Sequence, residues 1–201
     1  MVTDYRHFHL DVDEKNVLRL GIQVAGKSVN ILMSEVLKEL ADIFQNLSVK
    51  PPKGLIFYSK MERGFIFGAD INEFSDFKTE GAVAEHIAWV LDCFQQIEDL
   101  PCPTVILIDG ICVGGGFELA LAFDRIIATE QSQIGFPEVK LGLLPGYGGS
   151  ARAYERMGLK ASVDLVLTGR SINSEDALAI GAIDCVVQGK GPAYGCWISC
   201  T

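Results

Sequence analysis

The apolar residues of this chain follow two spacings, one typical of strands and one typical of helices. Every second residue is apolar from Leu18 to Val24, which predicts a half-buried strand. From Ser34 to Leu47 apolar residues recur every three or four positions, which predicts a helix capped by Ser34. The same helical spacing returns over Gly81–Leu100.

Short continuous apolar runs lie between the expected helices and are typical of strands buried on both faces. Strands are expected at 54–58, 64–70, 104–109, 125–129, 133–136 and 183–187, and further helices at 150–158, 160–167 and 175–180, the last capped by Ser174. Because strands alternate with helices, the predicted fold class is α/β, in one domain.

Composition agrees with one globular domain and narrows the possible partners. The chain has 201 residues, of which 49% are hydrophobic and 21% charged, enough for a sizeable core. A formal net charge of -9 argues against general binding to nucleic acid or to acidic membranes. No apolar run approaches the roughly 20 residues that cross a bilayer. The amino terminus has neither a basic start nor an apolar core, so we expect an untargeted, cytoplasmic protein.

The cysteines and histidines give no sign of a metal site. Cys93, Cys102, Cys112 and Cys185 lie in apolar stretches without metal-type spacing, so we expect reduced thiols in the core. The three histidines (His7, His9 and His86) have no catalytic context and are expected at the surface or at an interface.

Two glycine-bearing turns each follow a predicted buried strand, at Gly68–Asp70 and at Gly114–Gly116. Glycine lets the backbone approach a ligand closely, and two N–H groups that converge on one oxygen form an oxyanion hole. Ordinary packing and a generic phosphate-binding turn remain alternatives for the glycine run.

Two glutamates stand beside these turns among apolar neighbours. Glu118 falls in the first turn of the helix expected after the glycines, and Glu138 follows Pro137. Such carboxylates can act as an acid and base pair. Glu118 could instead only complement the helix dipole, and Glu138 could only cap a turn.

Four motifs in order resemble the enoyl-CoA hydratase/isomerase (crotonase) family. They are FGADINE (Phe67–Glu73), DGICVGGGFELA (Asp109–Ala120), GFPEVKLGLLPGYGG (Gly135–Gly149) and LTGRSINSEDALAIG (Leu167–Gly181). The resemblance covers about Val17 to Val187. Within the family, the chain is most similar to the amino-terminal hydratase modules of bacterial multifunctional fatty-acid oxidation α subunits.

The resemblance implies the ClpP/crotonase fold, a spiral of strand-strand-helix repeats, and an acyl-CoA thioester as substrate. By position, the N–H groups of Ala69 and Gly115 match the family's oxyanion hole. Glu118 and Glu138 match the two catalytic glutamates of the hydratases, which together hold one water. Isomerases of the family typically keep only the acid at the Glu138 position, so the pair favours 2-enoyl-CoA hydration in fatty-acid β-oxidation over 3,2-enoyl-CoA isomerisation or a bifunctional enzyme.

The same resemblance implies further contacts and no bound cofactor. Gly146 matches a backbone position near the water, while Asp70, Ile71 and Asn72 match a segment along the acyl-CoA, where family members often have Lys in place of Asn72. The implied reaction needs no metal or redox cofactor, since the substrate itself carries coenzyme A.

The end of the chain departs from the family pattern. We expect residues 1–188 to form the enoyl-CoA hydratase/isomerase domain without its carboxyl-terminal helices, and 189–201 to be an atypical tail from a truncated gene, a frameshift or a cloning boundary. Those helices close the acyl pocket and contribute to assembly in the family. The expected partner is therefore a second copy, in a trimer-based homo-oligomer, or a fatty-acid oxidation complex, and a non-catalytic CoA-binding or assembly module is a further alternative.

Overall fold

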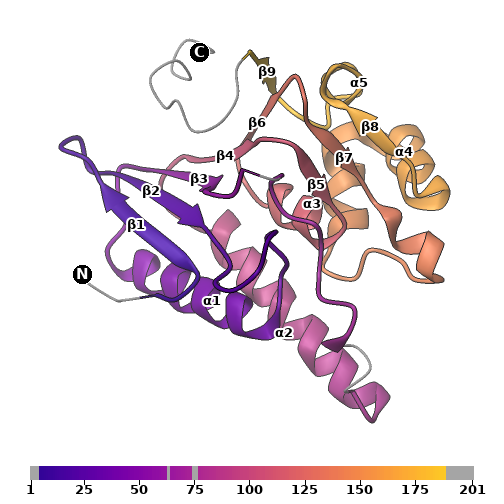
Figure 1. The fold of residues 1–201 in the computed structure, drawn as a ribbon, viewed down its shortest axis with the longest axis horizontal. Coiled ribbons are helices and arrows are strands. Elements are labelled where there is room, and N and C mark those ends of the chain that lie inside the picture. The colour runs from indigo at the N-terminus through magenta and orange to yellow at the C-terminus, as the bar shows by residue number, and fades with distance from the viewer. Residues whose placement is uncertain (1–4, 63, 74–76, 189–201) are drawn as a thin grey trace.

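The chain forms two β-sheets of unequal size, and helices pack around them (Figure 1). The computed structural model describes residues 5–62, 64–73 and 77–188. The larger sheet has the order β1-β2-β3-β4-β6-β9, and only the β1/β2 pair is antiparallel. Its strands are β1 (Phe8–Val12), β2 (Val17–Ile22), β3 (Gly54–Ser59), β4 (Thr104–Ile108), β6 (Arg125–Thr129) and β9 (Cys185–Val187).

The smaller sheet lies beyond the carboxyl end of β4 and has the order β5-β7-β8. Its β5/β7 pair is parallel and its β7/β8 pair antiparallel. The strands are β5 (Ile111–Val113), β7 (Gln133–Gly135) and β8 (Ser171–Asn173). Strands β1, β5 and β8 are absent from the sequence-based expectations, because three to five residues are too few to show a clear period.

The helices are amphipathic or short, and the long ones cover the core. They are α1 (Ser34–Val49), α2 (Glu80–Glu98), α3 (Gly115–Ala120), the 3-10 helix η2 (Pro137–Leu141), α4 (Gly149–Thr168) and α5 (Ser174–Ala179). Helices α1 and α2 pack side by side beneath the larger sheet (Figure 1). Helix α4 bends at Gly158, whose φ of 77° is not helical, so the two helices predicted there are confirmed as two segments.

Alternate residues of the central strands point into the core. Leu20 of β2 and Phe57 of β3 are fully buried. The ring of Phe57 lies 6.3, 5.9 and 5.6 Å from the rings of Phe8, Phe65 and Phe123. The described cysteines are free thiols, and three of them are buried as predicted (Cys93, Cys102 and Cys112).

The segment 64–70, predicted as a strand, is not one. It forms only isolated bridges, Ile66 with Cys112 and Ala69 with Leu32. Gly64 and Gly68 have φ of +77° and +103°, and such values break an extended run. The turn at Gly68 agrees with the glycine-bearing turn expected at Gly68–Asp70, but the apolar run gave no sign of the turn at Gly64.

Both predicted helix caps are also wrong. Ser34 is the first helical residue of α1, and the cap position is Met33. The N–H and the hydroxyl of Ser34 instead donate to the carboxylate of Glu73 at 2.9 and 2.7 Å. At α5 the cap is Asn173, whose side chain accepts from the N–H of Asp176. Glu73 thus ties the segment after Ala69 to the start of α1.

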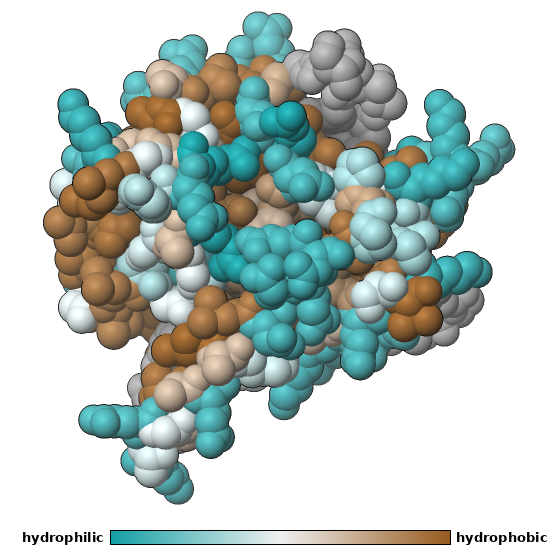
Figure 2. Space-filling model, turned by 180° about the vertical axis from the view of Figure 1, so that it is seen from behind, coloured by the Kyte–Doolittle hydropathy of each residue, from teal (hydrophilic) through white to brown (hydrophobic). Residues whose placement is uncertain are grey.

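Apolar side chains remain exposed on one side of the molecule. Figure 2 shows apolar colour spread over the side formed by α4 and α5, at the left of that view. The exposed residues on α4 and α5, at the end of η2 and in the loop that follows η2 are Leu141, Leu143, Leu144, Tyr154, Leu159, Val163, Leu167 and Leu178.

The buried side chain of Asn30 joins three segments of the chain. Its Oδ1 accepts from the N–H of Val24 at 3.0 Å, and its Nδ2 donates to the carbonyl of Phe65 at 2.9 Å and to the hydroxyl of Ser59 at 3.0 Å. The carbonyl of Asn30 also accepts from the N–H of Phe67. Asn30 therefore places the segment that leads to Ala69.

Replacement of Asn30 should destabilise the fold strongly. We expect Asn30→Ala to lower the free energy of unfolding by about 3 kcal/mol, because it leaves a buried amide and a buried carbonyl without their partner. Urea unfolding followed by circular dichroism measures the change. The control Asn46→Ala removes an exposed asparagine that bonds to Asp42 and should cost less than about 0.5 kcal/mol. Equal losses would contradict the assigned role of Asn30.

Candidate active site

A cavity of about 370 Å³ lies where α2, the β5–α3 turn and η2 meet. We call it the glutamate pocket. Four segments line it, namely 67–71, the first turns of α2, the glycine turn with α3, and η2 with the loop that follows. The lining residues are Phe67, Gly68, Ala69, Ile71, Val83, Ile87, Gly114, Gly115, Glu118, Pro137, Glu138, Leu141, Leu143, Leu144, Gly146 and Tyr147.

Two backbone amides meet at one wall of the pocket. The bonds from Leu32 N to Gly68 O and from Asp70 N to Leu32 O flank Ala69, so the N–H of Ala69 points away from Leu32. A Cβ built on Gly115 would lie 3.3 Å from the nitrogen of Ala69. Within the described residues neither the Ala69 nor the Gly115 N–H has a hydrogen-bond partner. Both are thus free to bind a ligand oxygen.

Glycine is required where these two turns approach each other. Gly114 has a φ of +56° and a Cβ there would lie 3.2 Å from Oε1 of Glu138. A Cβ on Gly116 would lie 2.7 Å from the carbonyl of Ile66. A side chain at Gly116 would therefore push the two turns apart, and one at Gly114 would displace the carboxyl group of Glu138.

Glu118 is buried on α3 with 2% of its surface exposed, and backbone N–H groups hold its carboxylate. Its Oε1 accepts from the N–H groups of Tyr147 and Gly149, each at 2.8 Å. A Cβ on Gly149 would lie only 2.5 Å from Cγ of Glu118, so glycine is needed there. These bonds orient the carboxylate within the pocket.

Glu138 is the second residue of η2, and its carboxyl group lies next to Gly114 of the glycine turn. Its Oε2 is buried and has no hydrogen-bond partner in the described part of the chain. A buried polar atom without a partner is costly, and such atoms are common at functional sites. Glu138 thus offers an unused acceptor, or a donor when protonated, at the pocket.

Both carboxyl groups hold their protons more tightly than ordinary glutamates. Burial raises the pKa of Glu118 to about 7, the N–H of Gly149 opposes this, and the charge of Glu138 adds to it. Burial also raises the pKa of Glu138. Acids whose pKa is raised above the ordinary value suit proton transfer.

The structure brings most of the predicted site residues together. Six line the glutamate pocket (Ala69, Gly115, Glu118, Glu138, Ile71 and Gly146). Asp70 and Asn72 do not, because Oδ1 of Asp70 accepts from the backbone and side-chain amides of Asn72 and so closes a local turn. The Ile71 side chain is 53% exposed at the rim.

Several lining residues were not predicted from the sequence. Tyr147 is buried beneath the loop, and its hydroxyl lies 3.1 Å from Nε2 of His86 on α2. Burial lowers the pKa of His86, and the charge of Glu73 opposes this. The expected surface position is wrong for His7, which is 1% exposed, whereas His9 is exposed and His86 is half-buried beside the pocket.

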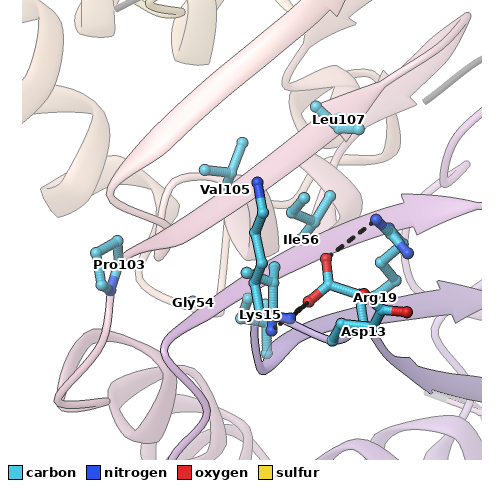
Figure 3. A pocket seen from close by; sticks show the side chains of 11 residues that line it. Asp13, Lys15, Arg19, Gly54, Ile56, Pro103, Val105 and Leu107 are labelled. Atoms are coloured by element: carbon cyan, nitrogen blue, oxygen red, sulfur yellow. Dashed lines mark hydrogen bonds and ion pairs between the residues drawn. The ribbon is translucent and has the colours of Figure 1, made fainter. Parts of the chain in front are cut away.

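A second hollow lies on the larger sheet, away from the predicted residues. Its volume is about 580 Å³. Figure 3 shows Ile56 and Val105 on its floor, with Arg19, Lys15 and Asp13 at its rim, where Arg19 pairs with Asp13 at 3.3 Å. No predicted site residue lines it.

Two searches of the described residues gave no candidate. No group of three or more metal-ligating side chains is found there. No helix in those ranges is long and apolar enough to cross a membrane.

The fold and the pocket define a crotonase-type α/β protein. Residues 14–190 match the family described as enoyl-CoA hydratase/isomerase, and the chain belongs to this family. Among curated proteins, fatty acid oxidation complex subunit alpha of Vibrio vulnificus (strain CMCP6) is 38% identical over 93% of this chain, and that of Vibrio cholerae (strain ATCC 39315) is 39% identical over 90%. The matched part of this chain spans only 27% and 26% of the length of these two proteins.

Solved structures confirm the expected fold. An enoyl-CoA hydratase from Bacillus anthracis superposes with a TM-score of 0.83 and 29% sequence identity. The match covers 90% of this chain and 70% of the hydratase chain. DspI of Pseudomonas aeruginosa superposes with a TM-score of 0.87 and 26% identity, covering 97% and 78%. The predicted crotonase-like α/β class is therefore correct.

The buried charge of Glu118 should lower stability at high pH. The pKa of Glu118 is about 7 in the folded chain against an ordinary 4.5, so the folded state binds more protons between these values. The free energy of unfolding therefore falls as pH rises through this window. Glu118→Gln keeps an oxygen for both amides without a charge, and it should raise the free energy of unfolding at pH 8 by about 2 kcal/mol.

Urea unfolding at about pH 8 and about pH 4 tests this linkage, because the gain should vanish once the wild-type carboxyl is protonated. The exposed Glu155 on the same side of the fold gives a matched control, Glu155→Gln. A gain that is independent of pH would refute the link to the Glu118 charge.

Proposed function

We propose that this chain is a 2-enoyl-CoA hydratase, adding water across the 2,3 double bond of an acyl-CoA thioester in fatty-acid β-oxidation. The observation that carries the proposal is one pocket that holds the buried carboxyl group of Glu118, the half-buried one of Glu138, and two amides, those of Ala69 and Gly115, that have no partner among the described residues. Membership of the enoyl-CoA hydratase/isomerase family supports it. So do relatives named as α subunits of fatty acid oxidation complexes.

The amides would bind the thioester oxygen. As the C3 carbon of the substrate is attacked, the electrons of the double bond move toward the thioester and negative charge grows on its oxygen. Two N–H groups fixed at 69 and 115 stabilise that charge more than they stabilise the neutral carbonyl. Removing one such donor typically slows a reaction by a factor of about 10² to 10³.

The carboxyl groups would divide the proton transfers. Glu118, ionised and oriented by two N–H groups, takes a proton from water, and the hydroxide forms the new bond to C3. Glu138, protonated, gives its proton to C2 of the enolate. The net change is the addition of one water, after which both groups exchange protons with solvent.

The apolar wall suits the acyl chain. Val83, Ile87, Leu141, Leu143 and Leu144 line the pocket beyond the two glutamates. Such side chains favour an alkyl tail over a polar one. The reaction as written moves protons and forms one C–O bond, so we propose that it uses no cofactor besides the coenzyme A of the substrate. Segment 70–72 is proposed to lie along the acyl-CoA.

Loss of either carboxyl should slow hydration. We expect Glu118→Gln and Glu138→Gln to lower kcat by a factor of about 10² to 10⁴, as is typical for an acid or base. In the wild type kcat/KM should fall below about pH 7 as Glu118 becomes protonated. Loss of the conjugated thioester absorbance of a short 2-enoyl-CoA measures both effects. Full activity in both variants would exclude these roles.

Isomerisation of a 3-enoyl-CoA is the alternative reaction within the same pocket. It needs one group to carry a proton between C2 and C4 and no activated water. The orientation of Glu118 by two backbone amides favours hydration. Product analysis after incubation with a 3-enoyl-CoA distinguishes the two, since only an isomerase or a bifunctional enzyme would consume it.

We also propose that the chain associates with further protein, either a second copy or the rest of a fatty-acid oxidation complex. Leu144, Leu159 and Leu167 are 63%, 65% and 62% exposed, on the loop beside the pocket and on α4. Contiguous exposed apolar surface is typical of association sites. A non-catalytic assembly module would bind CoA thioesters without turnover, so binding and turnover measured on one preparation separate these functions.

A further inference from the structure

The turn that presents two N–H groups to Glu118 is held from its other side by Arg152. Nη1 of Arg152 donates to the carbonyl of Tyr147 at 3.0 Å, and Nε donates to the carboxylate of Glu98 on α2. The Arg152 side chain is 11% exposed, so water competes little for these bonds. Arg152 thereby joins α2, the turn and α4.

Neither Gly148 nor Gly149 of this turn has room for a side chain. A Cβ on Gly148 would overlap the guanidinium of Arg152, and a Cβ on Gly149 would lie 2.8 Å from Oε1 of Glu118. The φ of Gly148, +89°, also favours glycine. The Tyr147–Gly149 backbone is therefore packed between a guanidinium on one side and a carboxylate on the other.

We propose that Arg152 is a positioning residue for Glu118: anchored by Glu98, it fixes the Tyr147 carbonyl and so keeps the N–H groups of Tyr147 and Gly149 aimed at the Glu118 carboxylate. The catalytic consequence rests on the proposed hydratase function. The positioning of the carboxylate does not, because it follows from the contacts alone.

Charged and titratable groups face Glu118 from each neighbouring element. Glu138 faces it from η2, Arg152 from α4 and Tyr147 from the turn, with Glu98 of α2 behind Arg152. Glu138 raises the pKa of Glu118 and Arg152 lowers it. Without Arg152 the carboxyl loses a nearby positive charge, and the two N–H groups are less firmly placed. Glu118 then ionises at higher pH.

The test compares Arg152→Gln and Arg152→Lys with Arg156→Gln. Arg156 is a matched control one turn later on α4, because its Nε donates to the carbonyl of Ala182 at 3.0 Å, it pairs with Asp184, and its side chain is 18% exposed. The readouts are kcat and KM for a short 2-enoyl-CoA, the pH dependence of kcat/KM, and the titration of Glu118 by NMR of ¹³C-labelled glutamate, assigned with Glu118→Gln.

We expect Arg152→Gln to lower kcat by about tenfold or more while KM changes by less than about twofold, because the base is misplaced and the substrate contacts remain. The Glu118 titration and the acid limb of kcat/KM should both move to higher pH. Arg152→Lys, which keeps a positive charge but not the planar fork, should recover part of both. Arg156→Gln should lower the melting temperature without moving either titration.

An unmoved Glu118 titration in Arg152→Gln, or an equal shift in Arg156→Gln, would overturn the proposal. If Arg152→Gln does not fold, Glu98→Gln decides, since it releases the anchor and should move the titration the same way. If the wild type turns over no enoyl-CoA but the titration moves as expected, the hydratase proposal fails and the role of Arg152 stands. If turnover is normal and the titration does not move, only the role of Arg152 fails.

Discussion

The buried carboxylate of Glu118 constrains everything around it. Glu118 is accommodated because two backbone N–H groups, from Tyr147 and Gly149, converge on one of its oxygens. Bonds to the ionised form offset part of the cost of burial. The burial of Glu118 also constrains the neighbouring loop. Gly149 must lack a side chain, and the loop between η2 and α4 must turn back toward α3. The loop that provides the amides also supplies part of the pocket wall.

The second constraint is the close approach of two turns that are distant in sequence. The segment around Gly68 is fixed by backbone bonds to Asn30 and Leu32, and the β5–α3 turn is fixed by pairing with Gly135. Between them, at one wall, the N–H groups of Ala69 and Gly115 have no partner in the part of the chain that the structure describes. Such unpaired donors cost stability in the empty protein and are useful only where a ligand oxygen arrives.

The glutamate pocket therefore combines features that oppose folding. Glu118, whose pKa is raised, lies in one cavity with an oxygen of Glu138 and two amides that have no partner among residues 5–62, 64–73 and 77–188. The large apolar core offsets this cost, with Phe57, Phe94 and Phe117 fully buried around the sheets. Such a concentration of polar groups that lack partners, within an otherwise well-packed fold, is typical of functional sites.

The sequence by itself determined the α/β class, most long elements and the chemical identity of the acids and glycine turns, because periodicity and glycine are local signals. Tertiary structure alone decided that the backbone also turns at Gly64, that Glu73 binds the start of α1, and that His86 reaches the hydroxyl of Tyr147. It also decided which residues meet, placing Ile71 in the pocket and Asp70 and Asn72 outside it. Contacts between distant segments depend on how whole helices and strands pack together, and a local sequence pattern does not predict this packing.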